Sequence, residues 1–176
     1  MINMTKIDEI LKLKIKPKEK IEQISKVIIN DKNKIEELID RFKNGSDVEK
    51  GTCAHVMKIV SAKESEIFKP YILDLIKYIN YKAPRVKWGI PETIGNLAEK
   101  YPKEVEQAIP KLMLNTTDKS TVVRWCAAFA LTEIAKYNLD KQKNLISEIK
   151  KLIKKEKNNG VKNVYLKGLK IIEKEK

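Results

Sequence analysis

Several residue types are scarce in this chain of 176 residues, and each shortage excludes a class of protein. There are two cysteines, six glycines, six prolines and only 6% aromatic residues. So few turn-forming and aromatic residues, beside abundant Ile, Leu, Lys and Glu, disfavour a sheet protein and predict an all-α fold. The cysteines lie in apolar helical patterns and are too few for a disulfide-rich secreted domain, so they are expected to be buried free thiols.

Long apolar runs are also missing. No segment approaches the length of a membrane span, and residues 1–9 lack the apolar core of a signal peptide. The sequence therefore predicts a soluble protein without a membrane span, located in the cytoplasm. The single histidine, His55, has no cluster of cysteines or carboxylates at metal-ligand spacing near it, and no glycine-rich phosphate loop occurs. No metal and no cofactor are expected.

Positive charge is the property in excess. The chain has 37 Lys and Arg against 24 Asp and Glu, for a formal net charge of +13. Such a charge attracts phosphate polymers, anionic membranes or acidic proteins. Arginine, which is better suited than lysine to bidentate contacts with phosphates and bases, occurs only at positions 41, 85 and 124. A binding function and a lysine-rich composition explain the charge equally well.

Apolar residues recur with a period of about 37 residues. One ladder comprises Val48, Val86, Val123 and Val161, and another comprises Ile35, Ile72, Ile109 and Ile146. The period predicts four units of two helices each, preceded by capping helices within residues 1–30. The units are expected at 31–62, 63–100, 101–138 and 139–176 of a single domain. Their first helices are expected at 32–43, 66–80, 103–115 and 141–157, and their second helices at 47–61, 85–100, 121–137 and 161–174.

A family resemblance rests on the third unit. Residues 108–112 belong to a first helix, Asp118 lies in the turn, and residues 123–131 read Val-Arg-Trp-Cys-Ala-Ala-Phe-Ala-Leu. This helix, acidic turn and Val-Arg-then-Ala-Ala-then-Leu pattern resembles a HEAT repeat. The resemblance implies a right-handed α-solenoid of about four helix pairs with one or two N-terminal capping helices, and a binding surface formed by the second helices.

Aromatic side chains recur at one position of these second helices. Trp88 and Trp125 each stand two residues after a ladder valine, and Glu92 and Phe129 follow them by four, so each pair lies on one helical side. Pro91 interrupts this region and predicts a kink or a restart of the helix. Packing of both Trp side chains between repeats would explain the same pattern. The residues expected to bind a partner are Trp88, Glu92, Arg124, Trp125 and Phe129.

The set Trp88, Glu92, Arg124 and Trp125 also resembles that of the DNA alkylation-repair glycosylases built from HEAT-like repeats. This resemblance implies that both Trp side chains pack against a nucleotide, that Glu92 stabilises an oxocarbenium-like centre, and that Arg124 holds a phosphate. Glu92 is the catalytic residue in this alternative, and duplex DNA is the partner. The leading interpretation is instead a non-enzymatic HEAT-like scaffold that binds a protein or a nucleic acid.

A lysine-rich segment at the C-terminal end is a second candidate site. Its basic patch comprises Lys150, Lys151, Lys154, Lys155, Lys162 and Lys167. Phosphate binding there would depend steeply on salt, because it releases counterions. The polar outer face that a terminal repeat needs explains the same residues.

Overall fold

The computed structural model describes residues 5–174, and every regular element in this range is helical. The α-helices are α1 (Lys6–Lys12), α2 (Pro17–Asn30), α3 (Ile35–Asn44), α4 (Asp47–Ser61), α5 (Ile72–Ile76), α6 (Pro84–Leu97), α7 (Pro102–Val105), α8 (Ile109–Asn115), α9 (Thr121–Tyr137), α10 (Leu139–Lys155) and α11 (Asn159–Lys174). Short 3-10 helices are η1 (Lys32–Lys34), η2 (Ser65–Tyr71) and η3 (Glu106–Ala108). The all-α prediction is therefore confirmed for the described residues.

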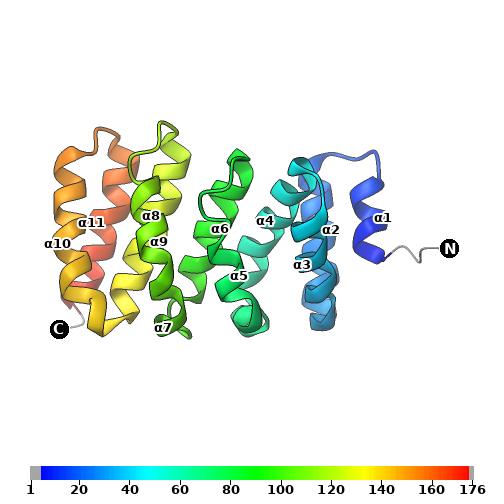
Figure 1. Cartoon of the computed structure of the whole chain (residues 1–176), viewed down its shortest axis with the longest axis horizontal. Helices are drawn as coiled ribbons and strands as arrows, with labels where there is room; N and C mark the ends of the chain where they lie inside the picture. The colour runs from blue at the N-terminus through cyan, green and yellow to red at the C-terminus, as the bar shows by residue number, and fades with distance from the viewer. Residues whose placement is uncertain (1–4, 175–176) are drawn as a thin grey trace.

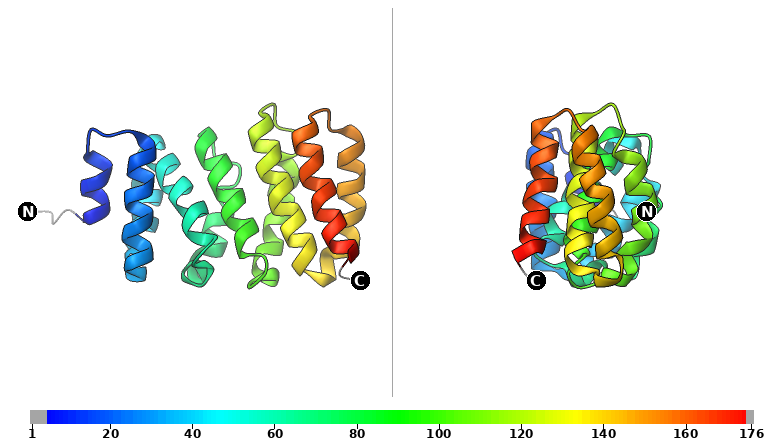
Figure 2. Two further views of the ribbon diagram at one scale, coloured as in Figure 1. Left: turned by 180° about the vertical axis from the view of Figure 1, so that it is seen from behind. Right: turned by 90° about the vertical axis from the view of Figure 1, so that its left-hand side faces the viewer.

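The helices follow one another along the long axis of the molecule (Figure 1). A front row contains α3, α5, α8 and α10. A back row contains α2, α4, α6, α9 and α11, and it faces the viewer when the molecule is turned round (Figure 2). Within the back row each helix packs against the next one along the chain. The expected second helices thus lie side by side in sequence order.

Local capping signals place several helix starts where the sequence predicts them. Ser46 and Glu49 form a reciprocal capping box at the start of α4, and Thr5 and Asp8 form another at the start of α1. The bounds of α4 and α9 coincide with the predicted 47–61 and 121–137. These helices combine a capped start with a continuous apolar pattern, so local and tertiary preferences agree.

The first helices of the two middle units are more broken than the period predicts. The expected helix 66–80 is the 3-10 helix η2 followed by the short α5, and Pro70 lies within η2. The expected helix 103–115 is divided into α7, η3 and α8, with Pro110 in the first turn of α8. Proline has no N–H to donate to the carbonyl four residues back, so the chain tightens into 3-10 turns at these positions.

The predicted restart of the helix at Pro91 is wrong. Helix α6 runs without interruption from Pro84 to Leu97, and Pro91 is buried inside it. Ile90 and Ile94 are both fully buried, and α6 packs against α4 on one side and α9 on the other. Packing on both sides keeps the helix continuous and outweighs the local cost of the proline.

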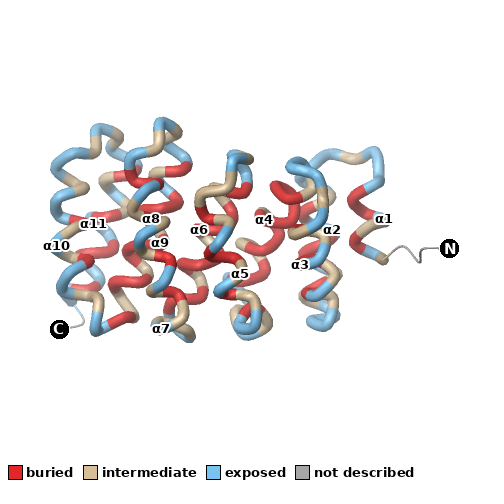
Figure 3. Tube along the Cα trace, in the orientation of Figure 1, coloured by how far each residue is buried: buried red, intermediate tan, exposed pale blue. Residues whose placement is uncertain are grey.

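Burial is concentrated where the rows and the units meet, and exposure at the turns (Figure 3). The ladder residues Val86, Val123 and Val161 are no more than 2% exposed. Val48 departs from the ladder because it is 75% exposed at the start of α4. Both cysteines are buried and free, as predicted.

Asparagine side chains join successive units inside the molecule. Asn115 Nδ2 donates to the Ile79 carbonyl at 3.1 Å, and Asn115 Oδ1 accepts from Asn80 Nδ2 at 2.8 Å. Asn138 Nδ2, at the start of α10, donates to the carbonyl of Pro102, at the start of α7, at 2.8 Å. These bonds satisfy buried polar groups that the apolar ladder does not reveal.

Gly89→Ala tests the close approach of α4 and α6. A Cβ atom at position 89 would lie 2.4 Å from the Ala54 carbonyl oxygen, and backbone atoms cannot yield as a flexible side chain does. We expect the free energy of unfolding, measured by urea denaturation, to fall by about 1–3 kcal/mol. The matched control is Gly160→Ala, where the only close neighbour is the Asn158 Oδ1 atom at 3.0 Å. Equal stability of the two variants would contradict tight packing at Gly89.

Candidate binding surface on the second helices

The back row carries all five of the predicted binding residues. Trp88 and Glu92 lie on α6, and Arg124, Trp125 and Phe129 lie on α9. Their side chains nevertheless lead to different places. Trp125 and Phe129 line a groove between α9 and α11, and Glu92 bridges three helices. Arg124 lines another hollow, and Trp88 lines two more.

The groove between α9 and α11 is built around two parallel aromatic rings. The rings of Trp125 and Phe129 are stacked, with centroids 6.0 Å apart and an interplanar angle of 6°. The spacing of four residues on one helix places the rings above each other. Trp125 is 37% exposed, and Ile171 on the opposite wall is 40% exposed. The groove has a volume of 510 Å³ and is also lined by Thr132, Glu133, Gly160, Asn163, Val164, Lys167 and Gly168.

Two glycines set the position of this groove. A Cβ atom at Gly95 would lie 2.7 Å from the Phe129 ring, so this glycine gives the ring its place between α6 and α9. A Cβ atom at Gly168 would lie 2.7 Å from Thr132, so α11 approaches α9 closely at the floor of the groove. Small residues at helix contacts let the helix axes come close. The rings are therefore held by the packing of α9 against α6 and α11.

Two charged side chains, Glu133 and Lys167, line the groove, and only Glu133 forms an ion pair within the described residues. Glu133 forms an ion pair with Lys136 at 2.9 Å on the same helix. Lys167 forms no ion pair with any described residue and is exposed. An exposed ammonium beside two apolar walls suits a ligand that is apolar in part and negatively charged in part.

Glu92 is engaged within the protein. Its Oε1 atom lies 3.0 Å from Lys58 Nζ of α4 and accepts from Cys126 Sγ of α9 at 3.4 Å. Burial and the neighbouring Glu92 charge raise the pKa of the Cys126 thiol, so this cysteine stays protonated at neutral pH. Glu92 thus links α4, α6 and α9, and the ion pair with Lys58 opposes its use as a free base.

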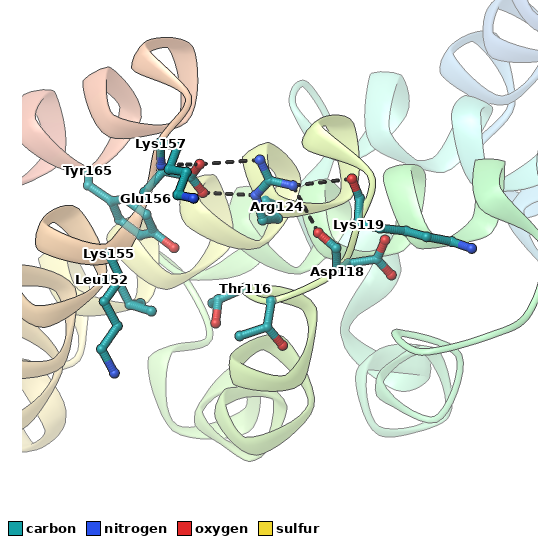
Figure 4. Close-up of a pocket in the computed structure, with 10 residues that line it drawn as sticks. Thr116, Asp118, Lys119, Arg124, Leu152, Lys155, Glu156, Lys157 and Tyr165 are labelled. Carbon is teal, nitrogen blue, oxygen red and sulfur yellow. Dashed lines mark hydrogen bonds and ion pairs between the residues drawn. The ribbon is translucent and has the colours of Figure 1, made fainter.

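Arg124 is also engaged within the protein (Figure 4). Its Nε and Nη2 atoms donate to the two carboxylate oxygens of Glu156 at 2.8 and 3.2 Å. Its Nη1 atom donates to the carbonyls of Asp118 and Lys119. This fork holds the turn before α9 to the turn after α10, and Arg124 lowers the pKa of Glu156 by hydrogen bonding. Arg124 faces a hollow of 390 Å³ that neither Trp residue lines.

Trp88 lies partly buried between two hollows on the other side of α6. One hollow contains His55 and Arg85, and the other is formed by the starts of α4 and α6. The Trp88 Nε1 atom is buried and has no hydrogen-bond partner among the described residues. Burial lowers the pKa of the half-buried His55, which favours its neutral form. The structure does not bring Trp88 together with Trp125.

The predicted basic patch divides between two helices. Lys150, Lys151, Lys154 and Lys155 are exposed on α10, whereas the other two, Lys162 and Lys167, lie on α11. Lys151 pairs with Glu148, Lys155 faces the Arg124 hollow, and Lys167 faces the aromatic groove. The α10 group forms one exposed cationic surface, and Lys167 belongs to the groove.

No helix among residues 5–174 is long and apolar enough to cross a membrane. Within the same range, no group of three or more His, Cys, Asp or Glu side chains is arranged to hold a metal ion. The sequence pattern did not predict that Arg85 lines the two hollows beside Trp88, nor that Lys167 lines the groove between α9 and α11. An arginine is available for binding only if folding gives it no partner, and no local spacing reveals that.

Glu156→Gln tests the fork at Arg124. The pKa of Glu156 is lowered in the folded state, so its contribution to stability is present above the ordinary value of 4.5 and is lost as pH falls through the folded value. We expect the variant to lose about 1–3 kcal/mol at pH 7 and to show a flatter fall in stability below pH 4.5. Denaturant unfolding across a pH series measures both.

Glu148→Gln is the control for this fork, because its pair with Lys151 is solvent-exposed. Exposed pairs of this kind contribute about 0–1 kcal/mol. Identical stability and pH profiles for the two variants would show that Arg124 does not depend on Glu156.

Comparison with known proteins adds no assignment to this surface. No protein-family model matches the chain, and no curated protein matches it significantly. The proposal for its function therefore depends on the residues and contacts described above.

Proposed function

We propose that this chain is a HEAT-like α-solenoid of right-handed helix pairs that acts as a non-enzymatic scaffold for a protein partner. The 37-residue ladders and the packing of the back-row helices in chain order support this proposal. Residues 1–30 then form the N-terminal cap, and 31–62, 63–100, 101–138 and 139–176 form the repeats. Two buried free thiols are compatible with a reducing compartment such as the cytoplasm.

The observation that carries the binding function is the exposed aromatic stack in the groove between α9 and α11. Large aromatic side chains supply much of the energy of protein interfaces when a partner covers them. Trp125 is 37% exposed in a groove of 510 Å³. A partner that covers Trp125 and Ile171 would gain about 25 cal/mol of binding free energy for each Å² of apolar surface that it buries. The entropic cost of association reduces this gain.

The chemistry of the partner follows from the walls of the groove. Trp125, Phe129 and Ile171 suit an apolar side chain. The exposed Lys167, which has no ion pair among the described residues, suits a carboxylate beside it. We therefore propose a protein segment that presents an apolar anchor next to an acidic residue.

Trp125→Ala tests the proposed surface. The side chain is exposed at its edge and makes no hydrogen bond that folding requires within the described range, so the fold should survive. We expect the affinity of a partner captured by the full chain to fall by about tenfold or more, because truncated interface tryptophans commonly cost at least about 1.4 kcal/mol. Quantitative mass spectrometry identifies the captured protein, and calorimetry with the purified protein measures its affinity.

The matched control for this experiment is Leu114→Ala. Leu114 is 68% exposed on α8 of the front row. Its substitution therefore removes an exposed apolar group away from the groove. It should leave the affinity unchanged. A partner that binds equally to Trp125→Ala, or one whose binding is abolished equally by Leu114→Ala, would refute the groove as the binding surface.

A second candidate function is nucleic-acid binding, and the net charge of +13 favours it. Lys150, Lys154 and Lys155 form no ion pair with any described residue, so their charges are available to phosphates. The base-excising alternative would require Glu92 to leave Lys58 and Arg124 to leave Glu156. Duplex binding by the α10 surface needs neither change.

A salt series tests this second candidate. If it holds, the native chain binds duplex DNA at about 50 mM salt and loses affinity steeply by about 200 mM. Substitution of all four α10 lysines, Lys150, Lys151, Lys154 and Lys155, by Gln should weaken binding. The slope of log affinity against log salt concentration should become less steep by about 0.9 for each phosphate that the variant no longer neutralises. Fluorescence anisotropy with a labelled duplex measures both quantities.

The control removes the same charge from the N-terminal half of the chain, at Lys14, Lys26, Lys63 and Lys69. Absence of binding at low salt, or equal weakening by both sets, would remove the α10 surface as a nucleic-acid site. Release of alkylated bases by the native chain but not by Glu92→Gln would instead support the base-excising alternative.

A further inference from the structure

A hollow on the edge of the back row lies apart from the groove between α9 and α11. It has a volume of 730 Å³ and is bounded by the first residues of three helices, α2, α4 and α6. Its apolar lining includes Pro17, Val48, Pro84 and one side of Trp88. A second hollow of 430 Å³, which contains Ile21, His55 and Ile59, shares Pro17, Arg85 and Trp88 with the first. Arg85 and Trp88 therefore stand between two adjoining cavities.

Arg85 is the arginine without a hydrogen bond or ion pair among residues 5–174. Arg41 pairs with Asp8, and Arg124 pairs with Glu156. Arg85 has no hydrogen bond and no ion pair with any described residue, and it is exposed. The scarcity of arginine makes this difference notable, because an arginine fork binds a carboxylate through two parallel hydrogen bonds.

The aliphatic stem of Arg85 is nevertheless held in place. A Cβ atom at Gly51 would lie 2.9 Å from Arg85 Cβ, 3.3 Å from its Cδ and 3.6 Å from its Cγ, so the stem lies flat on α4 where that helix has no side chain. A positioned stem lowers the conformational entropy that the side chain loses on binding. Gly51 thus pre-organises a free guanidinium at the mouth of both hollows.

The apolar wall of the hollow includes Val48, the ladder valine that is exposed and not buried. Val48 is 75% exposed, whereas Val86 at the equivalent position of the next unit is fully buried. The Val48 side chain faces the hollow together with Pro84. This combination of exposed valine, prolines and tryptophan forms an unpartnered apolar surface beside an unpartnered cation.

The rim charges restrict what the hollows can hold. Asp47 already accepts from Tyr81 and lies 3.2 Å from Lys82, and Glu22 lies 3.9 Å from Lys18. Each of these carboxylates is paired with a lysine of the rim, so Arg85 is the rim charge without an ion pair among the described residues. An isolated carboxylate on an otherwise apolar segment matches the single unpaired guanidinium.

We propose that Arg85 and the adjoining hollows form a peptide-binding site whose ligand is an apolar segment of another protein that carries one carboxylate. The carboxylate pairs with the Arg85 guanidinium, and a flanking apolar side chain enters the cavity between Val48, Pro84 and Trp88. This site does not depend on the groove between α9 and α11. Each site can fail its own test without affecting the other.

The test is a selection from a random peptide library displayed on phage, with the full native chain as the target. Selected peptides are synthesised with blocked ends, and their affinities are measured for the native chain, Arg85→Gln and Trp125→Ala. We expect one group of peptides to carry Asp or Glu beside apolar residues, to bind Arg85→Gln about tenfold more weakly, and to bind Trp125→Ala unchanged. Replacement of the acidic residue by its amide in such a peptide should weaken binding to a similar extent.

Gly51→Ala supplies a second variant that leaves all charges unchanged. An added Cβ displaces the Arg85 stem, so the same peptides should bind this variant more weakly. Circular dichroism and thermal melting establish that it remains folded, and Lys143→Gln, which removes an exposed charge on α10, is the control for non-specific electrostatics. In the Trp125→Phe chain, Trp88 is the sole tryptophan, and its emission should shift when these peptides bind.

The proposal is overturned if no selected peptide requires Arg85, or if Arg85→Gln and Lys143→Gln weaken binding equally. It is also overturned if single-stranded oligothymidylate binds in an Arg85-dependent manner and no acidic peptide does, since the site would then recognise phosphate. Peptides that fail to bind Trp125→Ala but still bind Arg85→Gln would report the groove between α9 and α11 and would not support this site.

Discussion

Close stacking of the back-row helices is the constraint on which the rest of the structure depends. Each helix of this row packs on its neighbours in the chain, and the contacts are tight because glycines face the adjacent backbone or side chains. Gly89 meets Ala54, Gly95 meets Phe129, and Gly168 meets Thr132. Apolar side chains from Ile7 to Ile172 form one buried cluster, so burial is continuous along the described part of the chain. Outward-facing residues are consequently held on a rigid support.

Polar contacts between units account for much of the charged composition. Lys87 reaches Asp118, Arg124 reaches Glu156, and Arg41 reaches Asp8, in each case over a separation close to one repeat. Such pairs join elements that are far apart in the chain, and their charges are engaged within the protein. The cations that form no ion pair with a described residue include Lys150, Lys154 and Lys155 on α10, Lys167 and Arg85. A formal net charge therefore says less about binding than the identity of the cations that folding leaves unpaired.

Regular features of the fold could be predicted because they depend on the chain's own spacing. The period of the ladders, the capping box of Ser46 and Glu49, and the burial of both thiols follow from local pattern. The broken helices around Pro70 and Pro110 and the unbroken helix through Pro91 did not follow. Pro110 lies in the first turn of α8, whereas Pro91 lies inside α6, and packing against α4 and α9 keeps α6 continuous.

The sequence by itself determined the helical class, the positions of most second helices and the placement of Trp125 and Phe129 on one side of α9, since each depends on residues close together in the chain. Tertiary structure alone decided that Arg124 and Glu92 are engaged within the protein while Trp125 and Arg85 are open to solvent. The physical reason is that a side chain's partners come from units about 31 to 38 residues away, whose approach depends on the packing of whole helices. Local periodicity indicates the face of a helix, and the neighbouring helix decides whether that face remains free.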